Sequence, residues 1–281
     1  MPDSIDSKKQ YKHLSNYYDI REIYPWLFSI RDPDNVFCYL IIGEKQALLY
    51  DTMYGIGSLP DLIKKITDKP VTVVLGHGHL DHANGAYQFD EVWLNKNDFE
   101  LCRMHTSQSF RCTIIDGIIE RKQALPENFN KNDYINAGSG NFKKLEAGQT
   151  FDLGGLTIEA IAMEGHTAGS IGLLAKEHKI LFDSDAANFH VWMFLPESLL
   201  ISQYIAMLKR TMLLDFETFF IGHSDLPLTK TDMQKMINIA HNASLDKAEP
   251  YITSDLFNIF NPMVYRDENG EIVFNKSKLE K

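Results

Sequence analysis

A short run of the chain, GHGHLDH over residues 76–82, brings together side-chain types that bind metal ions. It holds three histidines and one aspartate between His77 and His82. Imidazole nitrogens combined with a carboxylate are the ligands that a borderline-soft cation such as zinc prefers. At this histidine content, chance produces such a pattern on the order of once per thousand chains of this length. The run therefore predicts a metal site with His77, His79, Asp81 and His82 as ligands.

Three further candidate ligands, His166, Asp185 and His223, follow at wider spacing. Each lies just after a predicted strand or between two of them, where the backbone is irregular and side chains can converge on one point. A single histidine or aspartate at a strand end is usually structural, so each of the three counts only through its place in the order. Under the same rule, four other histidines are predicted to be ordinary surface or core residues: His13, His105, His178 and His241.

The elements that would position these residues alternate between short apolar strands and amphipathic helices. Strands are predicted within residues 26–51 and over residues 71–75, 91–95, 156–163, 169–175, 179–182 and 218–222. Helices are predicted from Ser58 to about residue 66, over residues 201–212 and over residues 230–246. Strands interleaved with helices in both halves of the chain predict an α/β protein.

The whole chain, residues 1–281, is predicted to form one domain with three additions. Residues 1 to about 20 are expected to be a polar arm. Residues from about 98 to 142 are mostly polar and interrupt the alternation, which predicts an inserted cap of helices and loops. Residues from about 250 to 281 are predicted to end in a hairpin that turns at Asn269-Gly270. An exposed strand there would offer a pairing edge to a second copy, so a homodimer is a candidate assembly.

Composition narrows the classes of partner and compartment. The net charge is -10 and the sequence pI is about 5.5, so the surface should repel phosphate backbones, which argues against a nucleic-acid partner. No apolar run approaches the roughly eighteen residues of a membrane helix, and the polar N-terminus lacks the apolar region of a secretory signal. The three cysteines form no CxxC pair, which fits a reducing compartment. These features predict a cytoplasmic protein that acts on a small-molecule substrate.

The order of the candidate ligands, HxHxDH followed by H, D and H, resembles that of the metallo-β-lactamase-fold metallo-hydrolases, and the resemblance runs from about Trp26 to Leu228. It implies a four-layer αβ/βα sandwich with the site at one edge. It also implies two bound Zn²⁺ ions, with iron or manganese as alternatives. The strand that ends at Asp51 is similar to one that supports the metal site in this family. The implied ligands are His77, His79 and His166 for one ion, Asp81, His82 and His223 for the other, and Asp185 as the bridge.

The resemblance also implies the reaction. Two ions that share a water make hydroxide available at neutral pH, and this hydroxide would attack a carbonyl or phosphoryl centre. Asp81 would act as the catalytic residue that orients the hydroxide and passes a proton to the leaving group. The ligand set is similar to those of glyoxalase II-like thioesterases and lactonases, which implies a small ester, thioester or lactone, whereas Asp185 argues against antibiotic hydrolysis. The alternatives are a phosphodiester hydrolase, a single-iron persulfide dioxygenase and a metal-binding protein without activity.

Departures from the family pattern leave the substrate class open. Gly76 stands where threonine or serine is usual, and Ser184 stands where glycine usually precedes the bridging aspartate. Residues 185–194, DAANFHVWMF, lack both the Cys-Gly-Arg loop expected of a glutathione thioesterase and the tyrosine expected of a lactonase. An arginine in the insertion would suit a carboxylate or phosphate on the substrate. The candidate pocket residues are His190, Trp192, Met193 and Phe194, whose aromatic members could instead be core, and Phe110, Arg111, Phe129 and Tyr134 in the insertion.

Overall fold

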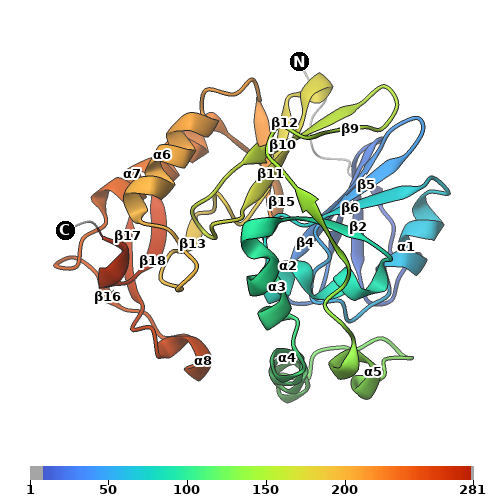
Figure 1. Cartoon of the computed structure of the whole chain (residues 1–281), viewed down its shortest axis with the longest axis horizontal. Coiled ribbons are helices and arrows are strands. Elements are labelled where there is room, and N and C mark those ends of the chain that lie inside the picture. Colours follow the sequence, from blue (N-terminus) through green and yellow to red (C-terminus); the bar gives the residue numbers. More distant parts are fainter. Residues whose placement is uncertain (1–8, 280–281) are drawn as a thin grey trace.

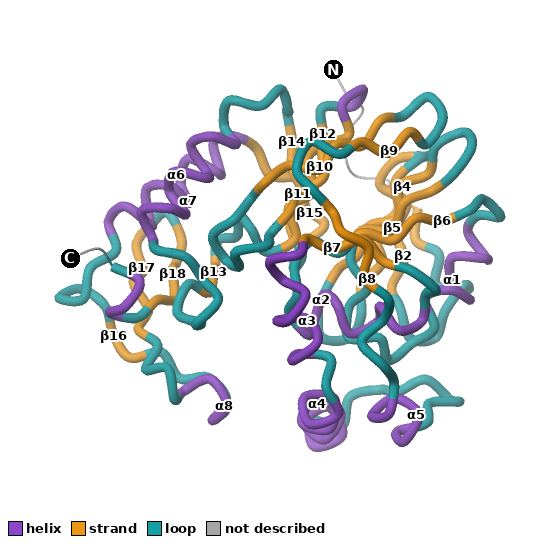
Figure 2. Tube along the Cα trace, in the orientation of Figure 1, coloured by secondary structure: helices purple, strands orange, loops and turns teal. Residues whose placement is uncertain are grey.

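Two β-sheets that face each other form the centre of the computed structural model, which describes residues 9–279 (Figure 1). One sheet has eight strands and the other has six, and a smaller sheet of four strands lies toward the C-terminus. Helices lie outside the two large sheets on opposite sides of the molecule (Figure 2).

The first sheet is built from the N-terminal strands in sequence order. These strands are β1 (Lys9–Gln10), β2 (Asp19–Tyr24), β3 (Leu27–Arg31), β4 (Phe37–Ile42), β5 (Ala47–Tyr50), β6 (Val71–Val74), β7 (Val92–Asn95) and β8 (Phe142–Leu145). Strands β1 to β5 pair in antiparallel fashion, whereas β5 to β8 run parallel. Parallel neighbours require a crossover, and α1 (Leu59–Ile66) supplies it between β5 and β6. The GHGHLDH run follows directly after β6.

The second sheet carries the later candidate ligands. Its strands are β9 (Thr150–Asp152), β10 (Thr157–Ala162), β11 (Ile171–Ala175), β12 (Ile180–Ser184), β14 (Thr218–Ile221) and β15 (Ser224–Thr229), in the spatial order β15-β14-β12-β11-β10-β9. Strands β12 and β14 are parallel and are connected through α6 (Ile201–Thr211), so both end at the same edge of the sheet. Helix α7 (Lys230–Asn242) follows β15.

Three apolar clusters show how the layers are stacked. Between the sheets, Tyr50 and Val74 of the first sheet pack with Phe182 and Phe220 of the second. A second cluster joins the outer face of the first sheet to α1 and to α3 (Phe99–His105). A third joins the outer face of the second sheet to α6 and α7. The order helix, sheet, sheet, helix confirms the predicted α/β fold class and the four-layer αβ/βα sandwich.

Helix α1 forms where its sequence signals predict it. The Ser58 hydroxyl accepts a hydrogen bond from the backbone N–H of Asp61, and Pro60 lies in the first turn, where no N–H donor is needed. The apolar stripe, which includes Leu59, Leu62 and Ile63, is buried against the first sheet.

Residues 98–142, predicted to be an inserted cap, contain three helices. These are α3, α4 (Gln108–Glu120) and α5 (Lys131–Asn136). Helix α3 packs on the first sheet through buried Cys102, so it belongs to the outer helical layer of the sandwich. Helices α4 and α5 share a small core of their own, formed around Ile115, Ile118 and Tyr134.

The C-terminal residues contain the predicted hairpin, with its turn displaced by one position. The elements of this region are β16 (Glu249–Pro250), α8 (Asp255–Asn258), β17 (Met263–Asp267) and β18 (Gly270–Phe274). Strand β13 (His190–Trp192), from an earlier part of the chain, completes their sheet. Asp267 pairs with Gly270, so the two turn residues are Glu268 and Asn269. Strand β18 also pairs with β13, and β17 with β16. Each hairpin strand therefore has a second neighbour, so the hairpin is not at the edge of its sheet, and the homodimer stays a prediction.

The prediction of a polar arm is wrong for part of the N-terminus. Strand β1 pairs with β2, and β2 begins at Asp19 as a full member of the first sheet. The rest of the arm, residues 1–8, lies outside the described residues. Within residues 9–279, no helix combines the length and the apolar character that crossing a membrane requires.

Candidate metal centre

The seven candidate ligands meet where strands of the two sheets end. The loop after β6 and the short helix α2 (Leu80–Ala83) carry the four ligands of the GHGHLDH run. The loop between β10 and β11 carries His166, and the ends of β12 and β14 carry Asp185 and His223. The structure brings the seven into two groups, within each of which the ligand atoms lie within 4.8 Å of one another: His77, His79 and His166, and Asp81, His82, Asp185 and His223.

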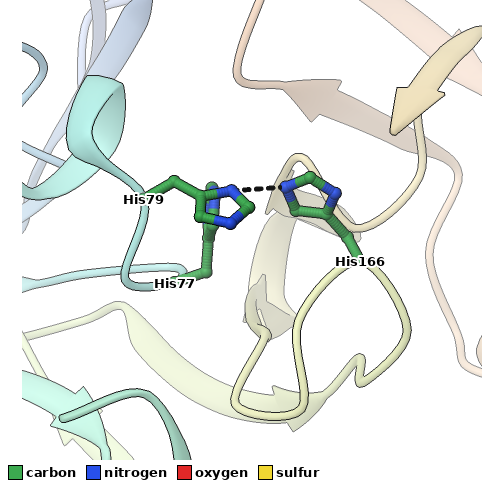
Figure 3. A group of neighbouring side chains, drawn as sticks. All are labelled: His77, His79 and His166. Carbon is green, nitrogen blue, oxygen red and sulfur yellow. Dashed lines mark hydrogen bonds between the residues drawn. The ribbon is translucent and has the colours of Figure 1, made fainter. Parts of the chain in front are cut away.

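The first group consists of three histidines (Figure 3). The Nε2 atom of His166 and the Nδ1 atom of His79 are 2.8 Å apart, on rings that come from different sheets. The ring centroids of His77 and His79 are 4.7 Å apart, and those of His77 and His166 are 4.9 Å apart. The Nε2 atom of His77 is buried and has no hydrogen-bond partner in the described part of the chain. A nitrogen of this kind, beside two others, suits a metal ion.

The second group combines two histidines with two carboxylates. The Nε2 atom of His82 lies 3.4 Å from the Oδ2 atom of Asp81 and 3.4 Å from that of Asp185. The same Asp185 oxygen lies 3.3 Å from Nε2 of His223 and 3.9 Å from Nε2 of His166 in the first group. Asp185 therefore lies between the two groups, in the place of the bridge that the resemblance implied.

All five histidines donate one ring N–H to an oxygen outside the two groups, which leaves the other nitrogen with a free lone pair. The Ser184 hydroxyl can accept from His77 because its own proton goes to Asp51. The pairs are His77 Nδ1 with Ser184 Oγ at 3.1 Å, His79 Nε2 with Glu197 Oε1 at 2.7 Å, His82 Nδ1 with Asp51 Oδ2 at 3.1 Å, His166 Nδ1 with the Trp192 carbonyl at 2.8 Å, and His223 Nδ1 with the Asn35 carbonyl at 3.4 Å. Outer hydrogen bonds of this type orient metal-binding histidines.

The charges of the two groups also favour a cation. Burial lowers the pKa of His77 well below its usual value and that of His166 to about 4, so both imidazoles are neutral, the form that binds metals. Burial also acts to lower the pKa of His223, but the Asp185 carboxylate outweighs it and raises the pKa to about 9. The carboxylates of the second group thus attract positive charge, and a bound cation would supply it.

Asp51 holds both groups in place from the end of β5. Its Oδ1 accepts a hydrogen bond from the backbone N–H of Gly76 at 2.7 Å, and its Oδ2 accepts from the Ser184 hydroxyl at 2.7 Å as well as from His82. Asp51 and Ser184 both have positive φ angles, 68° and 54°, which non-glycine residues adopt rarely and mostly at functional sites. Asp51 therefore orients His82 directly and His77 through Ser184.

Comparisons with known proteins agree with this geometry. The family model of the metallo-beta-lactamase superfamily matches residues 31–98. The archaeal metallo-beta-lactamase superfamily protein ST1585 from Sulfolobus tokodaii has a TM-score of 0.54 with this chain at 18% identity, covering 83% of this chain and 91% of that one. The matched segment is thus similar to the metallo-β-lactamase superfamily, and the fold is the one found in a member of that superfamily. The predicted resemblance is thereby confirmed.

Two curated relatives of this chain are named as hydrolases. The acyl-coenzyme A thioesterase MBLAC2 of Bos taurus is 26% identical over 159 residues, which cover 52% of this chain and 56% of that protein. The probable polyketide biosynthesis zinc-dependent hydrolase BaeB of Bacillus velezensis is 26% identical over 151 residues, which cover 53% of this chain and 54% of that protein. The match thus spans little more than half the length of each relative. One name is that of a thioesterase and the other that of a zinc-dependent hydrolase.

A buried carboxylate that the sequence did not single out joins two ligand-bearing loops of the metallo-β-lactamase fold. The Oδ2 atom of Asp98 accepts hydrogen bonds from the backbone N–H of Gly78 at 3.0 Å and from the Thr167 hydroxyl at 2.7 Å. Its Oδ1 atom accepts from the backbone N–H of Gly169 at 2.8 Å. Burial raises the pKa of the Asp98 carboxyl, and these three donors oppose the rise. Asp98 therefore fixes the loop of His77 and His79 to the loop of His166.

Glu197 is a second residue that the sequence did not single out. Its Oε1 atom accepts the hydrogen bond from Nε2 of His79, so Nδ1 of His79 is left free to face His166. Burial acts to raise the pKa of Glu197, but the bond to His79 outweighs it and lowers the pKa to about 2. An ionised Glu197 thus keeps His79 in the tautomer that the first group requires.

Replacing Glu197 with glutamine is expected to weaken the binding of a metal ion at the first group by about 10- to 100-fold, the usual cost of losing an outer carboxylate of a metal-binding histidine. The amide keeps the size of the side chain but removes the charge that holds His79 in place. Competition with a chromophoric chelator would measure the affinity of each ion. The exposed Glu217, changed to glutamine, serves as the control and should bind both ions as the parent does. Equal affinities in the two variants would contradict the prediction.

A cavity of about 370 Å³ opens beside both groups. Its polar wall includes His79, Asp81, His166, Asp185 and His223. The remaining lining residues are Tyr54, Leu80, His105, Asn188, His190, Val191, Trp192, Leu195 and Phe257. The cavity therefore has the candidate ligands on one side and a largely apolar wall on the other.

Several predicted pocket residues lie elsewhere. His190 and Trp192 line the cavity, but Met193 and Phe194 are buried core residues, each packed in an apolar cluster. His105, predicted to be an ordinary surface or core residue, is buried and also lines the cavity. Nothing in its spacing distinguished it, because only the packing of α3 brings it to the site.

Arg111 is the clearest error among the predicted substrate contacts. Its side chain is fully buried, and its guanidinium donates hydrogen bonds to the carbonyls of Thr106, Asn84 and Gly138. The guanidinium carbon also lies 4.7 Å from the ring centroid of Tyr87. Arg111 therefore ties the insertion to the rest of the chain and is not among the lining residues of the cavity. The other insertion candidates outside that lining are Phe110, Phe129 and Tyr134.

Proposed function

We propose that this protein is a dinuclear zinc hydrolase that cleaves the ester, thioester or lactone bond of a small acyl substrate, with a thioester as the leading case. The observation that carries the proposal is the set of five histidines, each donating one N–H outward and keeping one free nitrogen toward the two groups. Such an arrangement has no use without a cation, because it leaves His77 Nε2 and His82 Nε2 buried without hydrogen-bond partners.

The mechanism assigns a role to each side of the cavity. Two bound ions would supply hydroxide at neutral pH and would stabilise negative charge on the substrate oxygen. Asp81, at 3.4 Å from His82 Nε2 and 3.7 Å from His223 Nε2, is placed to hold a proton and to return it to the leaving atom. Trp192, Leu195 and Phe257 would bind the apolar acyl group and exclude water from it.

The composition of the cavity wall favours an acyl substrate over a phosphodiester. No lysine or arginine from the described part of the chain lines the cavity, so a second negative phosphate oxygen would find no cationic side chain there. Both ring nitrogens of His190 are engaged by neighbours, Nδ1 by Glu271 and Nε2 by Trp192 Nε1 at 2.8 Å. The similarity to a thioesterase and to a zinc-dependent hydrolase supports the same choice of reaction and of metal.

The test is a substrate panel assayed with zinc-loaded protein: an aryl ester, an acyl-coenzyme A thioester, an acyl homoserine lactone and a phosphodiester. We expect turnover of an acyl compound, and we expect the double variant Asp81→Ala, His82→Ala to lose it by on the order of 10³-fold, because the second group loses half of its ligands. The exposed Asp215, changed to alanine, is the control for a lost surface carboxylate. Turnover of the phosphodiester alone, or oxygen consumption by iron-loaded protein, would contradict the proposal.

A further inference from the structure

One polar side chain of the cavity wall has no role in the two ligand groups. His105, at the end of α3, is 4% exposed and lines the cavity. Its ring lies between two others: its centroid is 5.0 Å from that of His79 and 4.7 Å from that of Phe110, with interplanar angles of 19° in both cases. The insertion thus delivers an imidazole to the side of the cavity next to a candidate ligand.

The nitrogens of this imidazole are unpaired. Within residues 9–279, no hydrogen bond reaches either ring nitrogen of His105, and Nδ1 is buried. Leaving a buried polar group without a partner costs about 1–3 kcal/mol. A phenylalanine would continue the stack of rings without this cost. A histidine at this position therefore indicates a partner that enters the cavity from outside.

A third metal ion is the first partner to consider, because one ligand atom each from His79, His105 and Glu197 lies within 4.8 Å of the others. The contacts of His79 argue against it. Its Nε2–H donates to Glu197 and its Nδ1 faces His166, so it has no nitrogen left for another ion. His105 also lacks the outward N–H bond that all five candidate ligands make. The ring therefore faces the substrate space.

We propose that His105 is a substrate-contacting residue, which forms a hydrogen bond with the polar, carbonyl-bearing end of an acyl substrate. This inference rests on the proposed function. The polar end would lie between His105 and the two ligand groups, while the acyl chain would lie against Trp192, Leu195 and Phe257. The bond would be made by Nε2, the ring nitrogen that is not among the buried atoms, and it would give a partner to an imidazole that the described chain leaves unpaired.

Two substitutions separate the hydrogen bond from the stacking. His105→Phe keeps an aromatic ring between His79 and Phe110 and removes both nitrogens. His105→Gln keeps a hydrogen-bonding group and removes the ring. The control is His178→Phe, because His178 also stacks on an aromatic ring, that of Trp26, at a centroid distance of 4.0 Å, but is exposed and does not line the cavity.

Four quantities should be measured: zinc content, the melting temperature of zinc-free protein, kcat and KM for an acyl thioester, and the affinity of zinc-loaded protein for octanoate by calorimetry. His105→Phe should keep both zinc ions and an equal or higher melting temperature. It should lower kcat/KM by about 10- to 100-fold and weaken octanoate binding by about tenfold. His105→Gln should recover part of both losses, and His178→Phe should match the parent.

The outcomes also separate this inference from the proposed function. The parent protein could hydrolyse no compound of the panel and still bind octanoate through His105. That result would refute the proposed hydrolase activity and would support the contact between His105 and the substrate. Unchanged kcat/KM and octanoate affinity in His105→Phe would overturn the contact. Loss of a zinc ion in His105→Phe, or no octanoate binding by the parent, would overturn it as well.

Discussion

Replacing Asp185 with alanine is expected to remove one of the two zinc ions and to lower kcat/KM by on the order of 10³-fold. Asp185 is the carboxylate that approaches both ligand groups, at 3.4 Å from His82 Nε2, 3.3 Å from His223 Nε2 and 3.9 Å from His166 Nε2. Without it, the second group keeps one carboxylate, and nothing links it to the first.

The neighbouring residue Asp183 provides a matched control. It lies two positions earlier, near the end of β12, and is more deeply buried than Asp185; within residues 9–279, neither of its carboxylate oxygens has a hydrogen-bond partner. Asp183→Asn should keep both ions and full activity, because Asp183 is in neither ligand group, and burial raises the pKa of its carboxyl well above the usual value, so that a neutral amide resembles it. Metal analysis and steady-state kinetics on the two variants would test the prediction. An Asp185→Ala protein with two tightly bound ions would show that the carboxylate is no bridge.

Replacing Asp98 with alanine is expected to lower the free energy of unfolding by about 3 kcal/mol, the scale for leaving buried partners of a charged hydrogen bond unpaired. The two glycine amides and the Thr167 hydroxyl would lose their shared acceptor. The loops of the first group would then be free to separate, so the affinity for one zinc ion should also fall by about 10- to 100-fold.

Denaturant unfolding of zinc-free protein and zinc competition would measure these two effects separately. Thr167→Val is the graded control, because it removes one of the three hydrogen bonds and leaves the two glycine amides paired with Asp98. Its losses should be clearly smaller than those of Asp98→Ala. If the two variants lost equal stability and equal zinc affinity, the glycine bonds would have no part in holding the loops.

The strands and the ligand run were predictable because their signals are local. The apolar runs predicted to be strands, one before Gly76 and four later in the chain, correspond to β6, β10, β11, β12 and β14. Each strand begins and ends within two residues of its predicted bounds. The ligands of the GHGHLDH run are close in the sequence, so their proximity required no knowledge of the fold. His166, Asp185 and His223 could be added only through a resemblance, because the sheets bring them together.

Asp98, Glu197 and His105 could not be found in this way. Each is a single residue whose importance comes from contacts with distant parts of the chain. The signal for Asp98 was weak but present: it follows the strand over 91–95, and Gly169 lies after His166. A Cβ atom added to Gly169 would lie 2.4 Å from Oδ1 of Asp98, so this glycine permits the approach of the carboxylate.

Two departures from the family pattern, Gly76 and Ser184, are linked in the structure. Gly76 and Ser184 are neighbours in space, and a Cβ atom added to Gly76 would lie 2.6 Å from Cβ of Ser184. The hydroxyl that the first position lacks is therefore present on the second. There it donates to Asp51 and accepts from His77. The pair is an exchange of side chains across the site, which single positions of the sequence do not reveal.

Each ligand group takes members from both sheets, and this has a consequence for folding. His77, His79, Asp81 and His82 follow β6 of the first sheet, whereas His166, Asp185 and His223 follow or join strands of the second. Neither sheet alone carries all the ligands of one group. We therefore expect zinc to bind late in folding, after the two sheets have docked. A captured ion then acts as a removable cross-link between residues far apart in the chain. Amide hydrogens on the facing sheets would exchange together in the loaded protein and as two separate units after chelation.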